Sequence, residues 1–174
     1  MSWKKINDEV LYPKGLDRIT SVSKEDLDYL KEFALSNLRK RARICVHNSI
    51  NDNVHEMFIY HPKGTYVPPH KHTKNHESYF LIQGEFTVIF FDDDGTPIRM
   101  IEMGDIKTGK KFFFRMSKPI YRTILFKEDS FFLEVKQGPF TPDSFIVADW
   151  APTVENKPAV ENYLEMLAKK IKLI

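Results

Sequence analysis

Short apolar segments separated by turn residues dominate the central part of the chain. These segments are rich in β-branched and aromatic residues, and they cover residues 43–49, 54–60, 78–82, 85–91, 97–103, 112–116, 121–126 and 130–136. Turn-favouring sequences such as Asn51-Asp52-Asn53 and Asp93-Asp94-Gly95 lie between them. Short strands at near-regular intervals are typical of an antiparallel sandwich or barrel, so we predict an all-β fold.

Helical periodicity is found on both sides of this region. Ser23 and Asp26 resemble a capping box, and an apolar stripe follows at helical spacing, so we expect a helix over about residues 24–39. We interpret the stripe as a lid on the sheet in preference to a partner site. A second helical pattern begins after Pro158, and residues 1–22 predict irregular structure or a short strand.

The 174 residues suit one domain with a single core. We divide it into an N-terminal extension with the first helix (residues 1–40), a β-barrel core (41–140) and a C-terminal segment with the second helix (141–174). The 14 phenylalanines favour β-structure. We find no linker, repeat or low-complexity tract that would divide the chain.

Charge and cysteine content exclude several classes of function. With 26 basic and 24 acidic residues, the net charge of +2 gives no reason to expect binding to nucleic acid or to a membrane. Cys45 is the sole cysteine, which excludes an internal disulfide and favours a reducing compartment. No apolar run has the length of a signal peptide or of a transmembrane span, so we expect a cytoplasmic protein.

The candidate chemistry lies in one short stretch. His70 and His72 are separated by one residue, Glu77 follows, and Gly64 and Gly84 frame the set. Side chains two apart on a strand share a face, so both imidazoles can point inward, while Glu77 opens the next strand and can turn back towards them. Two imidazoles and a carboxylate predict a site for a divalent transition metal (Fe, Mn, Ni, Co or Zn) with open positions. The alternative is a solvated loop whose histidines bind nothing.

This stretch resembles the first sequence motif of the cupins, a family of small double-stranded β-helix (jelly-roll) proteins, and every motif position is matched. In cupins the two histidines and the glutamate are metal ligands at the mouth of the barrel. The resemblance therefore implies a cupin jelly roll, here with one flanking helix at each end. It also implies a metal held by His70, His72 and Glu77.

A narrower resemblance covers roughly residues 35–155. Here the chain is similar to the WbuC-type cupins of bacterial O-antigen and surface-polysaccharide gene clusters. The features that carry it are Arg41-Ala42-Arg43, His47, Pro69-His70-Lys71-His72, residues 91–95, residues 134–140 and Asp149-Trp150-Ala151-Pro152. The resemblance implies a cytoplasmic, homodimeric metalloprotein that acts on a small-molecule substrate in polysaccharide or sugar metabolism.

The second cupin motif departs from the family pattern. It usually supplies a fourth ligand histidine, but all six histidines of this chain precede Glu77, and Arg122 aligns with the missing one. Arginine is a permanent cation without an acceptor, so it would repel a metal ion and attract Glu77 or an anionic substrate group. The alternative is a shifted register that leaves Arg122 on the surface. Tyr121 could ligate ferric iron, but strand alternation turns it to the opposite face, where core packing is the alternative.

Other candidates surround this motif. His47 could complete the ligand set or be a structural histidine, and Arg41 and Arg43 could bind an anion or form a solvated basic patch with Arg39 and Lys40. For Cys45 we expect a buried, inert thiol. We expect the remaining histidines, His55, His61 and His76, on the surface.

Three functional hypotheses follow. The first is an enzyme, an isomerase, epimerase or oxygenase, with a metal at His70, His72 and Glu77 and with Glu77 and Arg122 as catalytic groups. In it Arg43, His47 and Tyr121 are candidates for cofactor binding. The second is a metal-free cupin that binds an acidic sugar or a nucleotide sugar through Arg122, together with Arg41 or Arg43. The third is a non-enzymatic sensor or accessory subunit.

Overall fold

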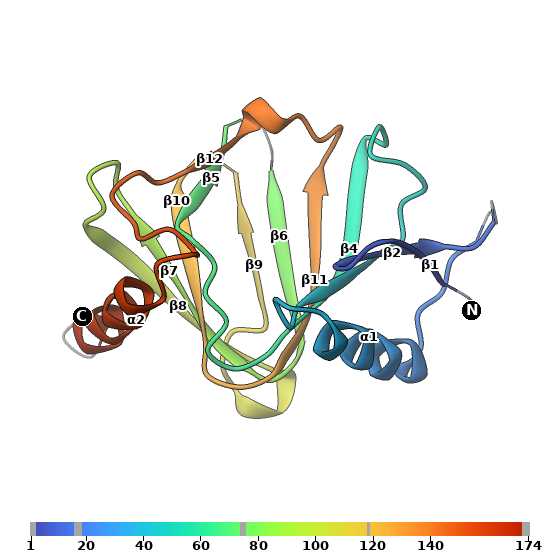
Figure 1. Cartoon of the computed structure of the whole chain (residues 1–174), viewed down its shortest axis with the longest axis horizontal. Coiled ribbons are helices and arrows are strands. Elements are labelled where there is room, and N and C mark those ends of the chain that lie inside the picture. The colour runs from blue at the N-terminus through green and yellow to red at the C-terminus, as the bar shows by residue number, and fades with distance from the viewer. Residues whose placement is uncertain (1–2, 16–18, 74–75, 118, 172–174) are drawn as a thin grey trace.

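Two β-sheets face each other in the computed structural model, which describes residues 3–15, 19–73, 76–117 and 119–171 (Figure 1). Within these ranges the strands form a seven-stranded sheet in the order β1-β2-β3-β4-β11-β6-β9 and a five-stranded sheet in the order β12-β5-β10-β7-β8. Neighbouring strands are antiparallel except β2 and β3, which are parallel. The arrangement agrees with the predicted jelly roll.

The seven-stranded sheet comprises β1 (Trp3–Asn7), β2 (Val10–Pro13), β3 (Ala42–Cys45), β4 (Val54–His61), β6 (Glu77–Gln83), β9 (Phe113–Met116) and β11 (Ser130–Gln137). The five-stranded sheet comprises β5 (His70–His72), β7 (Glu85–Phe91), β8 (Pro97–Gly104), β10 (Tyr121–Phe126) and β12 (Phe145–Val147). Each of the eight segments predicted from 43 to 136 overlaps one of these strands. The sequence did not predict β12, and for residues 1–22 it allowed one short strand where β1 and β2 both form.

Aromatic and branched side chains fill the space between the sheets. Leu81, Phe86, Val88 and Phe132 are each at most 3% exposed in this cluster. Gly84 makes the turn between β6 and β7 at φ +96°, and a Cβ there would lie 2.3 Å from the carbonyl oxygen of Asp129. The turn therefore requires glycine, as the sequence predicted.

Helix α1 (Lys24–Ser36) covers the outer face of the seven-stranded sheet. Ser23 and Asp26 form the predicted capping box, and Leu30 and Ala34 are fully buried against β3 and β4. The helix ends three residues before the predicted position 39. Asn37 adopts an extended conformation, and its side-chain amide donates to the carbonyl oxygens of Asp8 and Arg41. These contacts hold the chain out of helical geometry.

Helix α2 (Lys157–Ile171) covers part of the five-stranded sheet (Figure 1). Leu167 is buried in a cluster with Ile89 and Phe91 of β7, and Trp150 packs at its edge. Two 3-10 turns, η1 (Ile106–Thr108) and η2 (Pro142–Ser144), complete the regular structure of the described ranges. None of the described helices is both long and apolar enough to cross a membrane.

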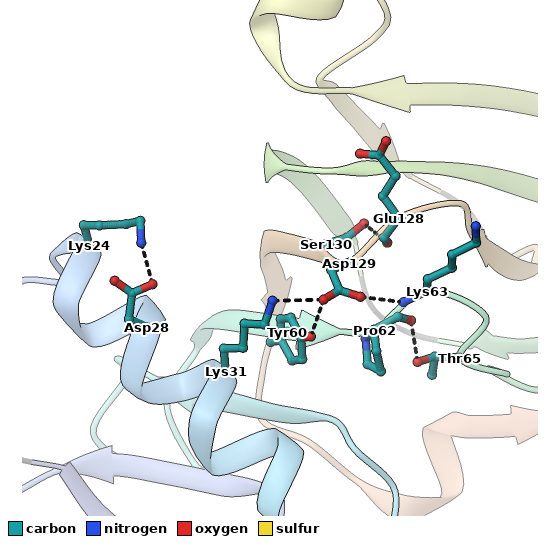
Figure 2. Close-up of polar contacts among 10 residues, drawn as sticks. All are labelled: Lys24, Asp28, Lys31, Tyr60, Pro62, Lys63, Thr65, Glu128, Asp129 and Ser130. Carbon is teal, nitrogen blue, oxygen red and sulfur yellow. Dashed lines mark hydrogen bonds and ion pairs between the residues drawn. The ribbon is translucent and has the colours of Figure 1, made fainter.

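A turn between β10 and β11 fixes α1 to the sheet (Figure 2). The carboxylate of Asp129 accepts hydrogen bonds from the Tyr60 hydroxyl (2.8 Å), the Lys31 ammonium (3.0 Å) and the backbone N–H of Lys63 (3.1 Å). Tyr60 is buried, and its hydroxyl ends at this partly exposed carboxylate. Asp129 thereby links the helix, β4 and the following loop.

We expect Asp129→Ala to lower the free energy of unfolding by about 1–3 kcal/mol, because the buried Tyr60 hydroxyl loses its acceptor. Chemical denaturation measures the change. Asp129→Asn keeps an acceptor oxygen and should lose less. Equal stability of the wild type and Asp129→Ala would show that this junction does not stabilise the fold.

Candidate functional site

Three strands bring the predicted site residues together. Arg122 on β10 lies directly opposite His70 on β5, and Glu77 begins β6 in the facing sheet. The Arg122 guanidinium forms an ion pair with a Glu77 carboxylate oxygen through Nη2, and Nη1 donates to the carbonyl oxygen of His70 at 3.1 Å. Arg122 and Glu77 are each 2% exposed. Arg122 therefore faces inward, as the alignment of the second motif predicted.

The two motif histidines lie beside this ion pair. His72 Nε2 is 3.0 Å from Glu77 Oε1, while His70 uses Nδ1 at 2.8 Å from the carbonyl oxygen of Pro68. The ring of Phe145 on β12 packs against both imidazoles, with centroid distances of 4.9 and 5.2 Å. Burial, with Arg122 close by, lowers the pKa of His70 well below its usual value. Burial, Lys136 and Arg122 lower the pKa of His72 to about 3, so both rings are neutral at pH 7.

Burial and the guanidinium act in opposite directions on Glu77. Burial raises the pKa of its carboxyl, and the positive charges of Arg122 and Lys136 oppose that rise. The attraction is mutual, since the nearby Glu77 carboxylate favours the charged form of Arg122. An opposite charge in direct contact is the usual condition for a buried carboxylate.

This arrangement does not fit the predicted metal ion. The guanidinium occupies one oxygen of Glu77, and its permanent charge would repel a divalent cation at the same carboxylate. Across the described ranges, no group of three or more histidine, cysteine, aspartate or glutamate side chains is placed to hold a metal. His72 contacts Glu77, and Arg122 contacts both Glu77 and the backbone of His70, but the three motif side chains do not form the predicted metal-ligand group.

A cavity of about 480 Å³ opens beside this group. Part of its wall is formed by His70, His72, Tyr79 and Arg122. Glu77 is not a lining residue. Apolar residues such as Ile124 and Phe132 line another part. A concave space of this volume that combines an apolar part with convergent polar and charged groups is typical of a small-molecule site.

The cavity also contains ionisable residues that the sequence analysis did not identify as site residues. Glu134 and Lys136 lie two apart on β11 and both line it, and Lys136 is 9% exposed. The available signal was strand alternation, which places both on one face with Phe132. The sequence analysis used this string only as part of the family resemblance.

His47 belongs to a hydrogen-bonded group at the cavity wall. Its Nδ1 accepts from the backbone N–H of Glu56 at 3.1 Å, and its Nε2 is 3.0 Å from the Tyr12 hydroxyl. Burial raises the pKa of Cys45, so the thiol stays protonated at neutral pH. His47 lines the cavity but is held within this group, away from the described contacts of Glu77.

Two expectations about histidines are wrong. His55 and His61 were expected on the surface, but they are 3% and 9% exposed and both line the cavity. The reason is alternation on β4, where His55, Met57, Ile59 and His61 share the inner face. His76 is exposed, as predicted.

Tyr121 lies on the opposite side of its strand. It packs against Trp150 at a centroid distance of 5.8 Å, and the Lys71 ammonium sits 4.2 Å from its ring centroid. It is absent from the cavity wall, so the structure does not bring Tyr121 to the site.

Arg41 and Arg43 both line the cavity, but they differ in ion pairing and exposure. Glu9 pairs with Arg41 at 3.2 Å and with Arg39 at 3.0 Å, which neutralises much of the predicted basic patch. Arg43 is exposed on β3.

Comparison with known proteins concerns the fold. A family model described as a domain of unknown function (DUF6016) matches residues 22–103, which include the histidine motif but not Arg122. No curated protein sequence matches the chain. This family model therefore covers only part of the chain.

Solved structures extend the comparison. Salicylate 1,2-dioxygenase from Pseudoaminobacter salicylatoxidans shares a TM-score of 0.56 at 10% identity, over 74% of this chain and 37% of that protein. CapF bound to 3-isopropenyl-tropolone has a TM-score of 0.50 at 12% identity, over 62% and 31%. A cupin superfamily protein from Desulfitobacterium hafniense DCB-2 is also similar (TM-score 0.47, 15% identity, 62% and 86%). The chain thus spans about a third of the two larger proteins, and at these identities the likeness concerns the fold alone.

Proposed function

We propose that the chain binds a small hydroxylated organic molecule, such as a sugar, in the cavity, without a metal ion. The observation that carries the proposal is the buried Arg122–Glu77 ion pair in the place where the motif predicted a metal. Here a guanidinium supplies the positive charge that an ion would supply. The guanidinium is part of the Arg122 side chain, so this positive charge is present whether or not metal ions are available.

Buried polar atoms without a hydrogen-bond partner support a bound molecule of this kind. Among the described residues they include Arg122 Nε, His72 Nδ1 and His61 Nδ1, all on residues that line the cavity. Buried polar groups are nearly always hydrogen-bonded, so these three atoms favour a site completed by another molecule. Arg122 Nε is a donor and the His72 Nδ1 ring nitrogen can accept, and a hydroxyl group can serve either.

We expect thermal-shift measurements, made on untreated and on EDTA-treated protein, to show stabilisation by a monosaccharide or a nucleotide sugar. A ligand at 100 times its Kd stabilises the folded state by about 2.7 kcal/mol. The stabilisation should be the same with and without EDTA. If EDTA abolished it, or if the purified protein held stoichiometric metal, the proposal of a metal-free site would be overturned.

A pair of matched variants tests whether the cavity is the binding site. Val67 lines it from the segment before β5, so Val67→Trp should fill the space and abolish the stabilisation. Ile98 is 54% exposed on β8 and lies outside the cavity wall, so Ile98→Trp should leave it unchanged. Equal responses of the two variants would place binding elsewhere.

A further inference from the structure

The cavity wall contains a buried lysine that the proposed function does not use. Lys136 is on β11, which lies between β4 and β6 (Figure 1), and its cross-strand neighbours are His55 and Glu77. Its ammonium lies 5.0 Å from the ring centroid of Phe140. Lysine is almost never this buried unless its charge is paired.

No carboxylate in the described part of the chain forms an ion pair with Lys136. Glu77 is the nearest candidate by strand register, but its two oxygens face Arg122 and His72. Glu134, two residues away on the same strand, also forms no ion pair within the described ranges. Lys136 is therefore a largely buried side chain that faces the cavity, and its ammonium forms no ion pair among the described residues.

The charges around the cavity leave a positive excess. The permanently charged cations and the carboxylates that line it are Arg41, Arg43, Arg122, Lys136, Glu9 and Glu134. Arg41 is neutralised by Glu9, and Arg122 by Glu77 behind the wall. Arg43 and Lys136 then stand against the single carboxylate of Glu134, which favours a ligand with one negative charge.

We propose that the ammonium of Lys136 binds the carboxylate of a sugar acid in this cavity, an inference that rests on the proposed function. It differs from the sequence-based hypothesis in the residue that meets the acid group. Arg122 and Arg41 already have carboxylate partners, whereas Lys136 has none among the described residues. Phe140 shields one side of the ammonium, which strengthens its attraction for an anion by reducing its contact with water.

Calorimetry with matched pairs of compounds tests the inference. EDTA-treated protein is titrated with glucuronate and glucose, with galacturonate and galactose, and with glucose 6-phosphate. We expect one acid to bind at least about tenfold more tightly than its neutral counterpart, as one charge-assisted contact in a shielded site can supply. Lys136→Met should remove this preference, so that the acid and its neutral counterpart bind with similar affinity. Lys136→Arg should retain most of the preference.

The folding of the variants gives an independent readout. If Lys136 has no partner in the free protein, Lys136→Met removes an unpaired buried charge, so its Tm should equal or exceed that of the wild type. A clearly lower Tm would mean that Lys136 already has a structural partner, and would overturn the inference. Lys107→Met changes an exposed lysine outside the cavity wall and should alter neither Tm nor binding.

The outcomes separate the inference from the proposed function. If neutral sugars bind the wild type as tightly as their acids, or if Lys136→Met keeps the preference, the inference fails and the proposed function stands. Tighter binding of glucose 6-phosphate than of either sugar acid would overturn the assignment of a carboxylate. Absence of binding by every compound would overturn both.

Discussion

Replacing Arg122 with methionine is expected to lower the free energy of unfolding by about 3–5 kcal/mol, the usual effect of removing one partner of a buried ion pair. Methionine keeps much of the length of the side chain, so the main change is the loss of the positive charge. The Glu77 carboxylate, 2% exposed, would be left without a counter-charge, and the carbonyl oxygen of His70 would lose a donor. Denaturant unfolding of the wild type and the variant measures the effect.

A double variant separates the charge from the packing. Glu77→Gln combined with Arg122→Met removes both charges, so we expect it to recover most of the lost stability, because a buried pair can often be replaced by neutral groups at little cost. If the double variant is no more stable than Arg122→Met, the loss arises from packing and the ion pair is not the stabilising feature.

The stability lost by Arg122→Met should depend on pH. Burial raises the pKa of Glu77 above its ordinary value of 4.5, and without Arg122 the chief opposing influence is gone. A carboxyl with a raised pKa in the folded state destabilises the fold as pH rises through and beyond 4.5, and has no such effect when it is protonated in both states. The pKa of Glu77 is already raised to about 7 in the wild type, so the deficit of the variant that arises from Glu77 should be small well below pH 7 and should grow as the pH rises through and above 7. A deficit that is constant with pH would mean that Glu77 is not its source.

Arg122→His is expected to convert the site into a metal site. The change removes a permanent cation and adds an imidazole near His70, His72 and Glu77. A unit charge at 4 Å in a medium of effective dielectric constant 20 contributes about 4 kcal/mol, so affinity for a divalent transition metal should rise at least about a hundredfold. Titration with Co²⁺ or Zn²⁺, followed by absorbance and by thermal shift, measures the gain.

Two controls accompany this variant. Arg122→Met removes the cation without adding a ligand, so it should bind metal less tightly than Arg122→His. Adding Glu77→Gln to Arg122→His removes the carboxylate ligand and should reverse the gain. Metal affinity equal to that of the wild type in Arg122→His would show that position 122 does not control the site.

Much of the architecture could be predicted from local patterns. Alternating and apolar segments identified the strands from β3 to β11, and the capping residues of α1 identified where that helix begins. The last strand, β12, could not be predicted, since its three residues are defined by pairing with β5, where Phe145 lies opposite His72. Likewise, β2 is set by its parallel pairing with β3, a contact remote in sequence.

Strand β11 shows why the site was predicted only in part. Phe131, Leu133 and Val135 alternate with Phe132, Glu134 and Lys136, and hydrophobicity favours burial of the first set. In the fold the second set lines the cavity, while Leu133 and Val135 are only half-buried. A polar cavity inverts the usual rule that the apolar face of a strand turns inward. Sequence pattern alone cannot indicate that inversion.

By itself the sequence predicted that His70 and His72 would share one face of a strand and that Glu77 would open the next strand, because side chains two residues apart on a strand point the same way. It also indicated, through the histidine missing from the second motif, that an arginine would join them. Only the tertiary structure decided that Arg122 binds Glu77 and that Lys136 faces the cavity. Both depend on distances between strands far apart in the chain, and ion pairing falls off within a few ångströms.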